Sequence, residues 1–297
     1  MRVLVLGGCG FIGRHVAEAL LRRGHAVRIG TRSPRRRLPG QRRVHFPRLT
    51  AAEAWTQHLD HIDVVVNAVG ILRERWGESY AVVHHLAPAA LARACAARGI
   101  RLIHVSALGL HAAARSRFIT TKLEGEHAIR ESGADYCIVR PSLLDGADGF
   151  GARWLRWLAR SPVLAVPADA RGRIAALDVD DLAEAIGGLC ERATFEAERE
   201  VELGGAISYT MPEYLMALRP AHAGRPSCVL RVPAWLARLC SHVCDLLHFS
   251  PFSYGHLELM RRDNCPHANA LPALLGCPPA AISRTLASRM HARHSPC

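Results

Sequence analysis

The sequence predicts an α/β fold, in which a doubly wound parallel sheet is followed by a smaller α+β lobe. An apolar, β-branched run opens the chain, and a glycine-rich turn and a helical pattern follow it directly. Strand and helix patterns then alternate, with short connections, to about residue 145. We therefore expect a core over residues 1–145 and a smaller mixed lobe over residues 146–297. The two are partly interleaved, because the helix expected at Asp178–Arg192 and the strand at Val201–Leu203 are candidates for the core.

Three glycines follow the first strand at the spacing G-x-x-G-x-x-G, as Gly7, Gly10 and Gly13. Gly7 and Gly10 would let the backbone approach a pyrophosphate, and Gly13 would let the helix pack closely on the strand. The free N–H groups at the helix start, at Phe11 and Ile12, and the helix dipole favour a bound phosphate. The motif predicts a dinucleotide site, and the alternative is a glycine-rich turn without a ligand.

The other elements of the core are expected from apolar runs and helical periodicity. A bend is expected near Pro88, which cannot donate a helix hydrogen bond. The expected strands are Ala26–Thr31, Val44–Pro47, Asp63–Gly70 with a turn at its end, Arg101–Ser106 and Tyr136–Arg140, and the expected helices are Ala51–Leu59, Ser79–Arg98 and Arg117–Ser132.

The lobe is expected to combine helices and strands. The carboxylates of Asp178-Val179-Asp180-Asp181 match a helix dipole, so we assign them structural roles. The apolar helix at Pro233–Phe249 is either a core helix of the lobe or a surface that docks on a partner or a bilayer edge. The other expected elements are helices at Gly149–Arg160, Gly255–Asp263 and Pro278–Met290, and a strand, turn and helix start between 202 and 213.

The charge of the chain is strongly positive, with a formal net charge of +12 over 297 residues. Lys122 is the only lysine among the 38 basic residues. We attribute the arginine excess to coding bias, because no nucleic-acid-binding signature occurs. The excess charge favours anionic ligands or a membrane surface.

Several classes of protein are not expected. No apolar run is long enough for a transmembrane helix, and Met1-Arg2 leads straight into a strand without a signal peptide. The ten cysteines are scattered, so we expect reduced, mostly buried thiols, with Cys9 as a small filler in the glycine turn. Adjacent His84 and His85 point apart on a helix, and we expect no metal site. The expected location is cytoplasmic, with a peripheral position at the inner face of the membrane as the alternative.

The second strand ends in a basic segment that bears on cofactor choice. No acidic residue occurs between Glu18 and Glu53, although an NAD site usually has a carboxylate there for the ribose 2′-OH. Guanidinium groups suit a 2′-phosphate instead. We therefore expect NADP(H) rather than NAD(H), held by Arg32 and by Arg35 or Arg36. The alternative is a solvated basic loop.

Two residues are candidates for the reactive site. Ser106 ends a strand at the edge of the sheet where the dinucleotide would lie. Lys122 lies on the following helix, and the single use of lysine in an arginine-rich chain indicates a site that needs a compact ammonium group. An accidental lysine on an exposed face is the alternative.

The order of several motifs resembles that of the atypical and extended short-chain dehydrogenases/reductases. The motifs are Gly7-x-x-Gly10-x-x-Gly13, Asn67-Ala68-Val69-Gly70, His104-Val105-Ser106-Ala107, Phe118-x-x-x-Lys122, Arg140-Pro141-Ser142 and Asp178-Val179-Asp180-Asp181. Three further stretches are similar to the branch that contains the Rossmann-fold accessory subunit of respiratory complex I. They are Val69–Arg73, Val201–Gly205 and Arg262–Asn264.

The resemblance implies a Rossmann sheet, a nicotinamide dinucleotide, and a serine, tyrosine and lysine that act together. Ser106 and Lys122 take two of these roles, and Phe118 stands where the family has the tyrosine, so the usual proton donor is missing. Leu6 replaces a usual threonine, and Arg48 stands where an adenine-binding aspartate is common. The implied cofactor-binding residues also include Asn67, Ala68, Val69, Gly70, Pro141 and Ser142.

Three functions are compatible with these observations. The first is an NADP(H)-binding protein with a degenerate reductase site and a structural or assembly role linked to respiratory complex I or to quinone metabolism. The second is an active NAD(P)-dependent reductase, epimerase or dehydratase that acts on a small carbonyl compound or a sugar nucleotide. The third is an NADPH-sensing regulator. The corresponding partners are a nicotinamide dinucleotide and a respiratory complex or membrane surface, and not nucleic acid.

Overall fold

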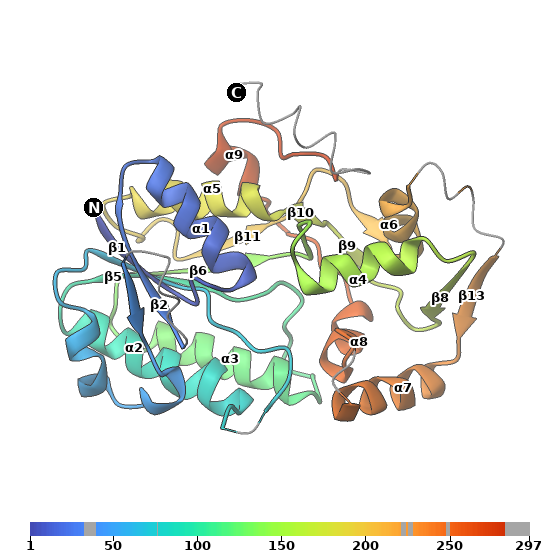
Figure 1. Cartoon of the computed structure of the whole chain (residues 1–297), viewed down its shortest axis with the longest axis horizontal. Helices are drawn as coiled ribbons and strands as arrows, with labels where there is room; N and C mark the ends of the chain where they lie inside the picture. The colour runs from blue at the N-terminus through green and yellow to red at the C-terminus, as the bar shows by residue number, and fades with distance from the viewer. Residues whose placement is uncertain (33–39, 76, 221–223, 225–227, 248–249, 283–297) are drawn as a thin grey trace. The chain divides into compact units, whose positions relative to one another are not determined.

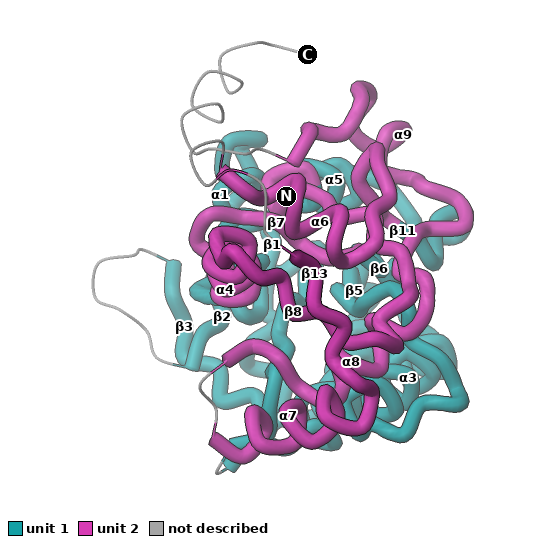
Figure 2. The backbone as a smooth tube through the Cα atoms, turned by 90° about the vertical axis from the view of Figure 1, so that its right-hand side faces the viewer, with its two compact units in different colours: residues 1–141, 182–202 teal, residues 142–181, 203–297 magenta. Residues whose placement is uncertain are grey.

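The computed structural model describes residues 1–32, 40–75, 77–220, 224, 228–247 and 250–282 (Figure 1). The chain forms two compact units (Figure 2). Unit 1 contains Met1–Pro141 and Leu182–Glu202, and unit 2 contains Ser142–Asp181 and residues from Leu203 onward.

The elements up to β6 are β1 (Arg2–Leu6), α1 (Phe11–Arg22), β2 (Ala26–Thr31), β3 (Gln41–Arg43), η1 (Phe46–Arg48), η2 (Ala52–His58), β4 (Val64–Asn67), η3 (Ala81–Leu86), α2 (Ala87–Ala96), β5 (Arg101–Val105), α3 (Arg117–Arg130) and β6 (Tyr136–Pro141). The later elements are β7 (Leu144–Asp145), α4 (Phe150–Ala159), β8 (Val163–Pro167), β9 (Arg173–Ile174), β10 (Leu177–Asp178), α5 (Val179–Cys190), β11 (Glu200–Leu203), β12 (Tyr209–Thr210), α6 (Met211–Leu218), β13 (Cys228–Val232), α7 (Ala234–Leu247), α8 (Tyr254–Met260) and α9 (Leu271–Leu275).

Unit 1 is built on a seven-stranded sheet in the order β11-β6-β5-β4-β1-β2-β3. All pairings from β3 through β6 are parallel. The first strand lies at the centre, where Val5 pairs with Ile29 on one side and with Val66 on the other. In Figure 1, α1 and α5 cover one face of the sheet and α2 and α3 the other. The doubly wound parallel α/β fold expected from the sequence is therefore confirmed.

The third strand differs from the expectation. The strand predicted at Val44–Pro47 is wrong: β3 lies at Gln41–Arg43, and Phe46–Arg48 forms a 3₁₀ turn. An edge strand pairs through its backbone on one side, so polar side chains are tolerated there. The apolar residues that follow are buried in the core of unit 1, and their proline has no N–H for a ladder. The helix expected at Ala51–Leu59 is a 3₁₀ helix, at Ala52–His58.

The long helix before β5 forms as expected, with an irregularity next to its proline. A π-helical stretch, Ala81–Leu86, leads directly into α2. Pro88 has no N–H to donate to the carbonyl of His84. Gly125 of α3 lies against that carbonyl, and a Cβ at Gly125 would stand 1.9 Å from the His84 oxygen. The π-helical stretch and the glycine therefore allow the two helices to approach closely.

Unit 2 has a separate core beneath α4 and α6. The start of α6 is fixed by a capping box, in which the Thr210 N–H donates to Glu213 Oε2 at 2.7 Å and the Thr210 hydroxyl accepts from the Glu213 N–H. The side chain of Asp178 accepts the Asp180 N–H at 2.9 Å, which is the structural role expected for it. The fully or nearly buried side chains of this core are Ala159, Leu164, Val166, Ala170, Ile174, Ala176, Met211, Tyr214, Leu215 and Leu218.

The helix α7 buries only a narrow side, at Ala237, Ser241 and Cys244. An apolar stripe on this helix remains exposed, and its members are Trp235, Leu239, Val243, Leu246 and Leu247. The interpretation of this segment as a core helix of the lobe therefore holds for one side only. None of the helices among the described residues combines the length and apolarity needed to cross a bilayer.

Two further expectations for the chain need correction. Residues 278–282 are not helical, the rest of the helix predicted at Pro278–Met290 lies outside the described residues, and α9 was not anticipated. The nine described cysteines are free thiols, but Cys9, Cys228 and Cys240 are exposed and two others are half-buried, so most are not buried. Cys228 is exposed because most of β13 is exposed, and Cys240 because α7 buries only one side.

Candidate functional site

The glycine turn has the geometry that a pyrophosphate site requires. Gly7 has a φ of +74°, which favours glycine, and the Gly10 N–H donates to the Gly7 carbonyl at 2.7 Å. A Cβ at Gly13 would stand 2.3 Å from the same oxygen and would displace the turn from the helix. The turn therefore depends on glycine at these three positions.

The helix that follows the turn presents free backbone donors. Its cap, Gly10, is extended and makes no side-chain cap. The Arg14 N–H is the first to bond back, to the Gly10 carbonyl at 3.2 Å. The N–H groups of Phe11, Ile12 and Gly13 have no acceptor within the helix and lie where a phosphate would bind. The residues present therefore fit a dinucleotide diphosphate.

The end of β4 lies directly beside this turn. The Ala68 N–H donates to the Leu6 carbonyl at 3.1 Å, and a Cβ at Gly7 would stand 3.0 Å from the Ala68 oxygen. The Asn67 side chain is fully buried: its Oδ1 accepts the Val69 N–H at 3.2 Å. Asn67 thus shapes the turn over Ala68, Val69 and Gly70 from within, and the structure brings this segment together with the glycine turn.

The predicted phosphate clamp is described only in part. Arg32 follows β2, and its guanidinium pairs with the carboxylate of Glu78, a half-buried residue. Arg35 and Arg36 lie outside the described residues. A 2′-phosphate at Arg32 would compete with Glu78 for the guanidinium, a partner that the sequence did not indicate.

One face of α3 carries Phe118, Lys122 and Glu126, each four residues from the next. The ammonium of Lys122 lies 5.8 Å from the centre of the Phe118 ring. Burial lowers the pKa of Lys122 to about 8, and the nearby Glu126 carboxylate opposes this shift. Ser106 follows β5, is buried, and has a hydroxyl near Glu126, outside strict hydrogen-bonding geometry. The structure therefore brings Ser106, Phe118 and Lys122 together.

The Phe118 side chain occupies a closed aromatic cluster. It is 7% exposed and meets the rings of Tyr80 and His84 edge-on, with centroids 5.8 Å and 5.5 Å away. Tyr80 and His84 stack on each other at 5.2 Å. The hydroxyl of Tyr80 donates to the Leu72 carbonyl at 2.8 Å. A phenol from another element thus lies beside the position of the missing one, although the sequence did not place Tyr80 there.

Two buried histidines next to this site are held neutral. Burial, with the charge of Lys122, lowers the pKa of His84 to about 2 and that of His104 to about 3. The Ile71 N–H donates to His84 Nε2 at 3.3 Å, so the ring proton sits on Nδ1. The Asn67 amide contacts His104 Nδ1 at 3.1 Å, so that ring carries its proton on Nε2. These rings add hydrogen bonds and no charge to the site.

Glu126 is the site residue that sequence reasoning missed. It is 1% exposed, and its Oε2 pairs with Arg140 at 2.6 Å and with Arg130 at 3.0 Å. Both arginines also pair with Glu200, at 2.8 Å and 2.6 Å. These contacts, with the Ser106 hydroxyl, hold the pKa of Glu126 below its usual value despite burial. The four-residue spacing after Lys122 was a signal that could have identified it.

The remaining predicted residues divide between the units. Pro141 ends β6, and its carbonyl accepts the Leu108 N–H at 3.0 Å. Ser142 belongs to unit 2, where its hydroxyl accepts the Ala175 N–H at 3.2 Å and donates to the Asn264 carbonyl.

Comparison with known proteins places this geometry in context. A family model described as NAD(P)H-binding matches residues 7–156. A ceramide reductase of Caulobacter vibrioides is 30% identical over 193 residues, which are 63% of this chain and 60% of that protein. An epimerase family protein of Mus musculus is 42% identical over 84 residues, 27% of this chain and 25% of that protein. The chain thus matches less than two thirds of the length of these relatives.

Solved structures share the fold over almost the whole chain. A short-chain dehydrogenase/reductase superfamily protein from Agrobacterium tumefaciens, with bound NAD, has a TM-score of 0.70 at 18% identity, covering 99% of this chain and 97% of that one. UDP-N-acetylglucosamine 4-epimerase from Bacillus cereus has a TM-score of 0.67 at 16% identity, covering 99% of each. At these identities the likeness concerns the fold alone.

Proposed function

We propose that this chain, which belongs to the NAD(P)H-binding family, holds NADP(H) in unit 1 and turns it over poorly, because Phe118 occupies the position of the proton donor. The glycine turn, the free N–H groups of α1 and the end of β4 supply the dinucleotide site. Lys122 would hold the nicotinamide ribose, as the resemblance implies. The bound dinucleotide would supply a hydride, and the chain lacks a phenol on α3 to accompany it with a proton.

The observation that carries the proposal is the packing of Phe118. Its ring is buried between Tyr80 and His84 and has no polar atom. His84 is neutral and engaged through both ring nitrogens, with the Ile71 N–H and the Thr121 hydroxyl, so it offers no free proton. A positioned acid typically contributes about 10²–10⁴-fold to a rate, and its loss leaves cofactor binding intact.

The test is the substitution Phe118→Tyr. We expect it to raise carbonyl-dependent oxidation of the reduced cofactor by about 10²-fold or more, measured at 340 nm with NADPH and with NADH on a panel of aldehydes and ketones. NADPH should be preferred if Arg32 meets the 2′-phosphate. Phe118→Leu should give no gain, and adding Lys122→Met to Phe118→Tyr should remove the gain.

A second candidate function, an active NADP(H)-dependent reductase, is favoured by Tyr80. Its ring lies beside Phe118, and the ammonium of Lys122 lies on the same face of α3 as Phe118. The name of the Caulobacter relative favours a reductase over an epimerase. If the wild-type chain already matches the rate of Phe118→Tyr, and Tyr80→Phe abolishes that rate, this second function replaces the first.

For the structural role we propose a partner of the respiratory complex I type, as the sequence resemblance implies. The exposed stripe of α7 supports a docking role, because Trp235 and Leu246 are 69% and 77% exposed. We expect the chain to co-purify with membranes and respiratory subunits and Leu239→Glu to abolish this. Leu21→Glu, at an exposed leucine of α1, is the control. Recovery of the wild-type chain without respiratory subunits would contradict the proposed partner.

A further inference from the structure

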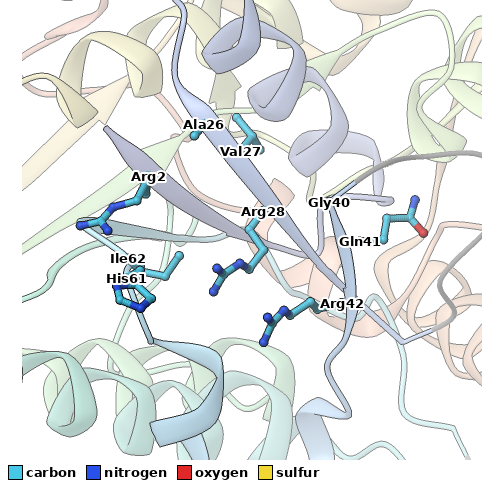
Figure 3. A pocket seen from close by; sticks show the side chains of 9 residues that line it. All are labelled: Arg2, Ala26, Val27, Arg28, Gly40, Gln41, Arg42, His61 and Ile62. Carbon is cyan, nitrogen blue, oxygen red and sulfur yellow. The ribbon is translucent and has the colours of Figure 1, made fainter.

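Unit 1 has a concavity along β2, between the amino end of β1 and the edge strand β3. Its volume is about 390 Å³, and its lining includes Arg2, Val27, Arg28, Arg42, His61 and Ile62 (Figure 3). Arg2 opens β1 and lies roughly 13 Å from the glycine turn at the usual rise of a strand, whereas Arg42 lies level with Leu6, just before that turn. The printed lining contains no residue of the glycine turn or of the end of β4, so the concavity is distinct from the dinucleotide site.

Three arginines share the face of the sheet that borders this pocket. The register pairs Arg2 with Ala26, and Arg42 with Gly30, so alternation places Arg2, Arg28 and Arg42 on one face. Figure 3 shows the side chains of Arg28 and Arg42 extending into the same space. Arg43 belongs to the opposite face. The sheet register therefore places these three positive charges on the same face.

The carboxylates near the pocket offset this charge only in part, since the charge of Asp60 also acts on Arg28. Asp63 pairs with Arg2 at 2.8 Å, and Asp60 pairs with a guanidinium outside the pocket at 3.1 Å. Arg28 donates to the backbone carbonyl of Asp60 at 3.0 Å. Among the described residues, neither Arg28 nor Arg42 has a carboxylate partner. Burial and the charge of Arg42 lower the pKa of Arg28, so the two guanidinium groups oppose each other.

The pocket also has a strained backbone at its rim. His61 has a φ of +58°, and among the described residues it is the only non-glycine with a positive φ. Such conformations are uncommon for a residue with a side chain and concentrate at functional sites. The turn places the exposed imidazole of His61 beside the arginines, and Ile62 provides apolar surface next to it.

We propose that this pocket binds a small phosphate monoester, with its dianionic phosphate between Arg28 and Arg42 and its carbon skeleton against Ile62. Two guanidinium groups that have no ion-paired carboxylate among the described residues match the two charges of the phosphate and its bidentate geometry. The volume is that of a small-molecule site. The ligand binds independently of the nicotinamide dinucleotide.

The test is calorimetric titration of the full chain with glycerol 3-phosphate and with inorganic phosphate, in the presence of saturating NADPH. We expect both to bind, glycerol not to bind, and Arg28→Gln or Arg42→Gln to weaken binding by about tenfold or more. Arg43→Gln, on the same strand but the opposite face, should bind as the wild type does. Arg42 is exposed, so its variant is expected to fold, which a thermal melt checks.

Three results would overturn the proposal: no binding of either phosphate, equal binding by Arg42→Gln and wild type, or equal weakening in Arg43→Gln. Binding confined to vesicles that contain phosphatidic acid, or to a nucleic acid duplex, would also overturn it in favour of a macromolecular surface. NADPH affinity should be the same in all these variants. A chain that binds phosphate but not NADPH would refute the proposed function and leave this site standing.

Discussion

Lys122 is held between two opposing influences. Burial beside Phe118 disfavours its charged form, and the Glu126 carboxylate favours it, with the result that its pKa is about 8. Arginine would remain charged at this position and has a wider, planar head group. Lys122 is the only lysine of the chain. Its burial and the nearby carboxylate explain why lysine, and not arginine, stands at this position.

The lowered pKa of Lys122 predicts a pH dependence of stability. Between pH 8 and 10.5 the folded lysine loses its proton while the unfolded one keeps it, so the unfolded state binds more protons and stability rises with pH. We expect Lys122→Met to remove this contribution. Chemical unfolding of both chains at pH 7.5, 9 and 10.5 checks it, through the difference between their free energies of unfolding.

The free energy of unfolding of the wild type should increase relative to that of Lys122→Met as pH rises. Tyrosines and cysteines titrate in the same range but are common to both chains, and so they cancel. A difference that is constant from pH 7.5 to 10.5 would show that the lysine ionises normally.

For single residues, the sequence predicted which side chains share one face of a helix. It did not predict the ion-pair partners that come from distant segments. Helical spacing alone puts Phe118 and Lys122 on one face of α3. The pairing of Arg140 with Glu126 depends on how β6 lies beside α3, and the pairing of Arg32 with Glu78 joins residues 46 positions apart. No periodicity encodes such contacts.

Among the elements, the contact between η3 and α3 is the most demanding. The approach of Gly125 to the His84 carbonyl leaves no room for a methyl group. The same contact supports the aromatic cluster around Phe118, since both His84 and Phe118 belong to these two elements. The spacing of two helices thus sets the geometry of the site.

We expect Gly125→Ala to destabilise the chain by about 1–3 kcal/mol, through overpacking against the backbone. Gly151→Ala is the matched control, because Gly151 is also helical and has open space where a Cβ would lie. That change should be neutral or stabilising by up to about 1 kcal/mol. Thermal unfolding measures both, and equal effects would mean that the helices can move apart at little cost.

Buried strands were the predictable elements. Val64–Asn67 and Arg101–Val105 are buried strands that are mostly apolar, with Val64–Val66 and Leu102-Ile103 as their apolar stretches, as expected for parallel strands covered on both faces. The edge strand Gln41–Arg43 has no apolar pattern, because its role is fulfilled by backbone pairing. The apolar residues that follow it have the sequence pattern of a strand, but in the structure they are core residues around a 3₁₀ turn.

At the scale of the whole molecule, unit 1 is completed by a late part of the chain. The buried face of α5 includes Leu182, Ile186 and Leu189, and α5 pairs with α1 through Arg22 and Glu184 at 2.7 Å. After α5, Glu200 completes the ion-pair network around Glu126. The family model ends at residue 156, so matching this family does not delimit a complete unit.

We therefore expect a chain cut after Pro141 to lack a cooperative thermal transition. It would leave β6 as an open sheet edge and the α5 side of the sheet uncovered. A chain in which a short Gly/Ser linker replaces residues 142–181 and joins Pro141 to Leu182–Glu202 should recover the transition. Circular dichroism on heating distinguishes the two, and a cooperative melt of the shorter chain would show that the late segment is dispensable.

The interleaving of unit 1 also has a consequence for biosynthesis. The segment 182–202 emerges from the ribosome only after about forty residues of unit 2. Until then, the nascent sheet exposes an unpaired edge and an uncovered apolar face, which are surfaces that chaperones bind. A slow stretch of translation after Glu202 would help the nascent protein, whereas a pause after Pro141 would prolong its exposure to aggregation.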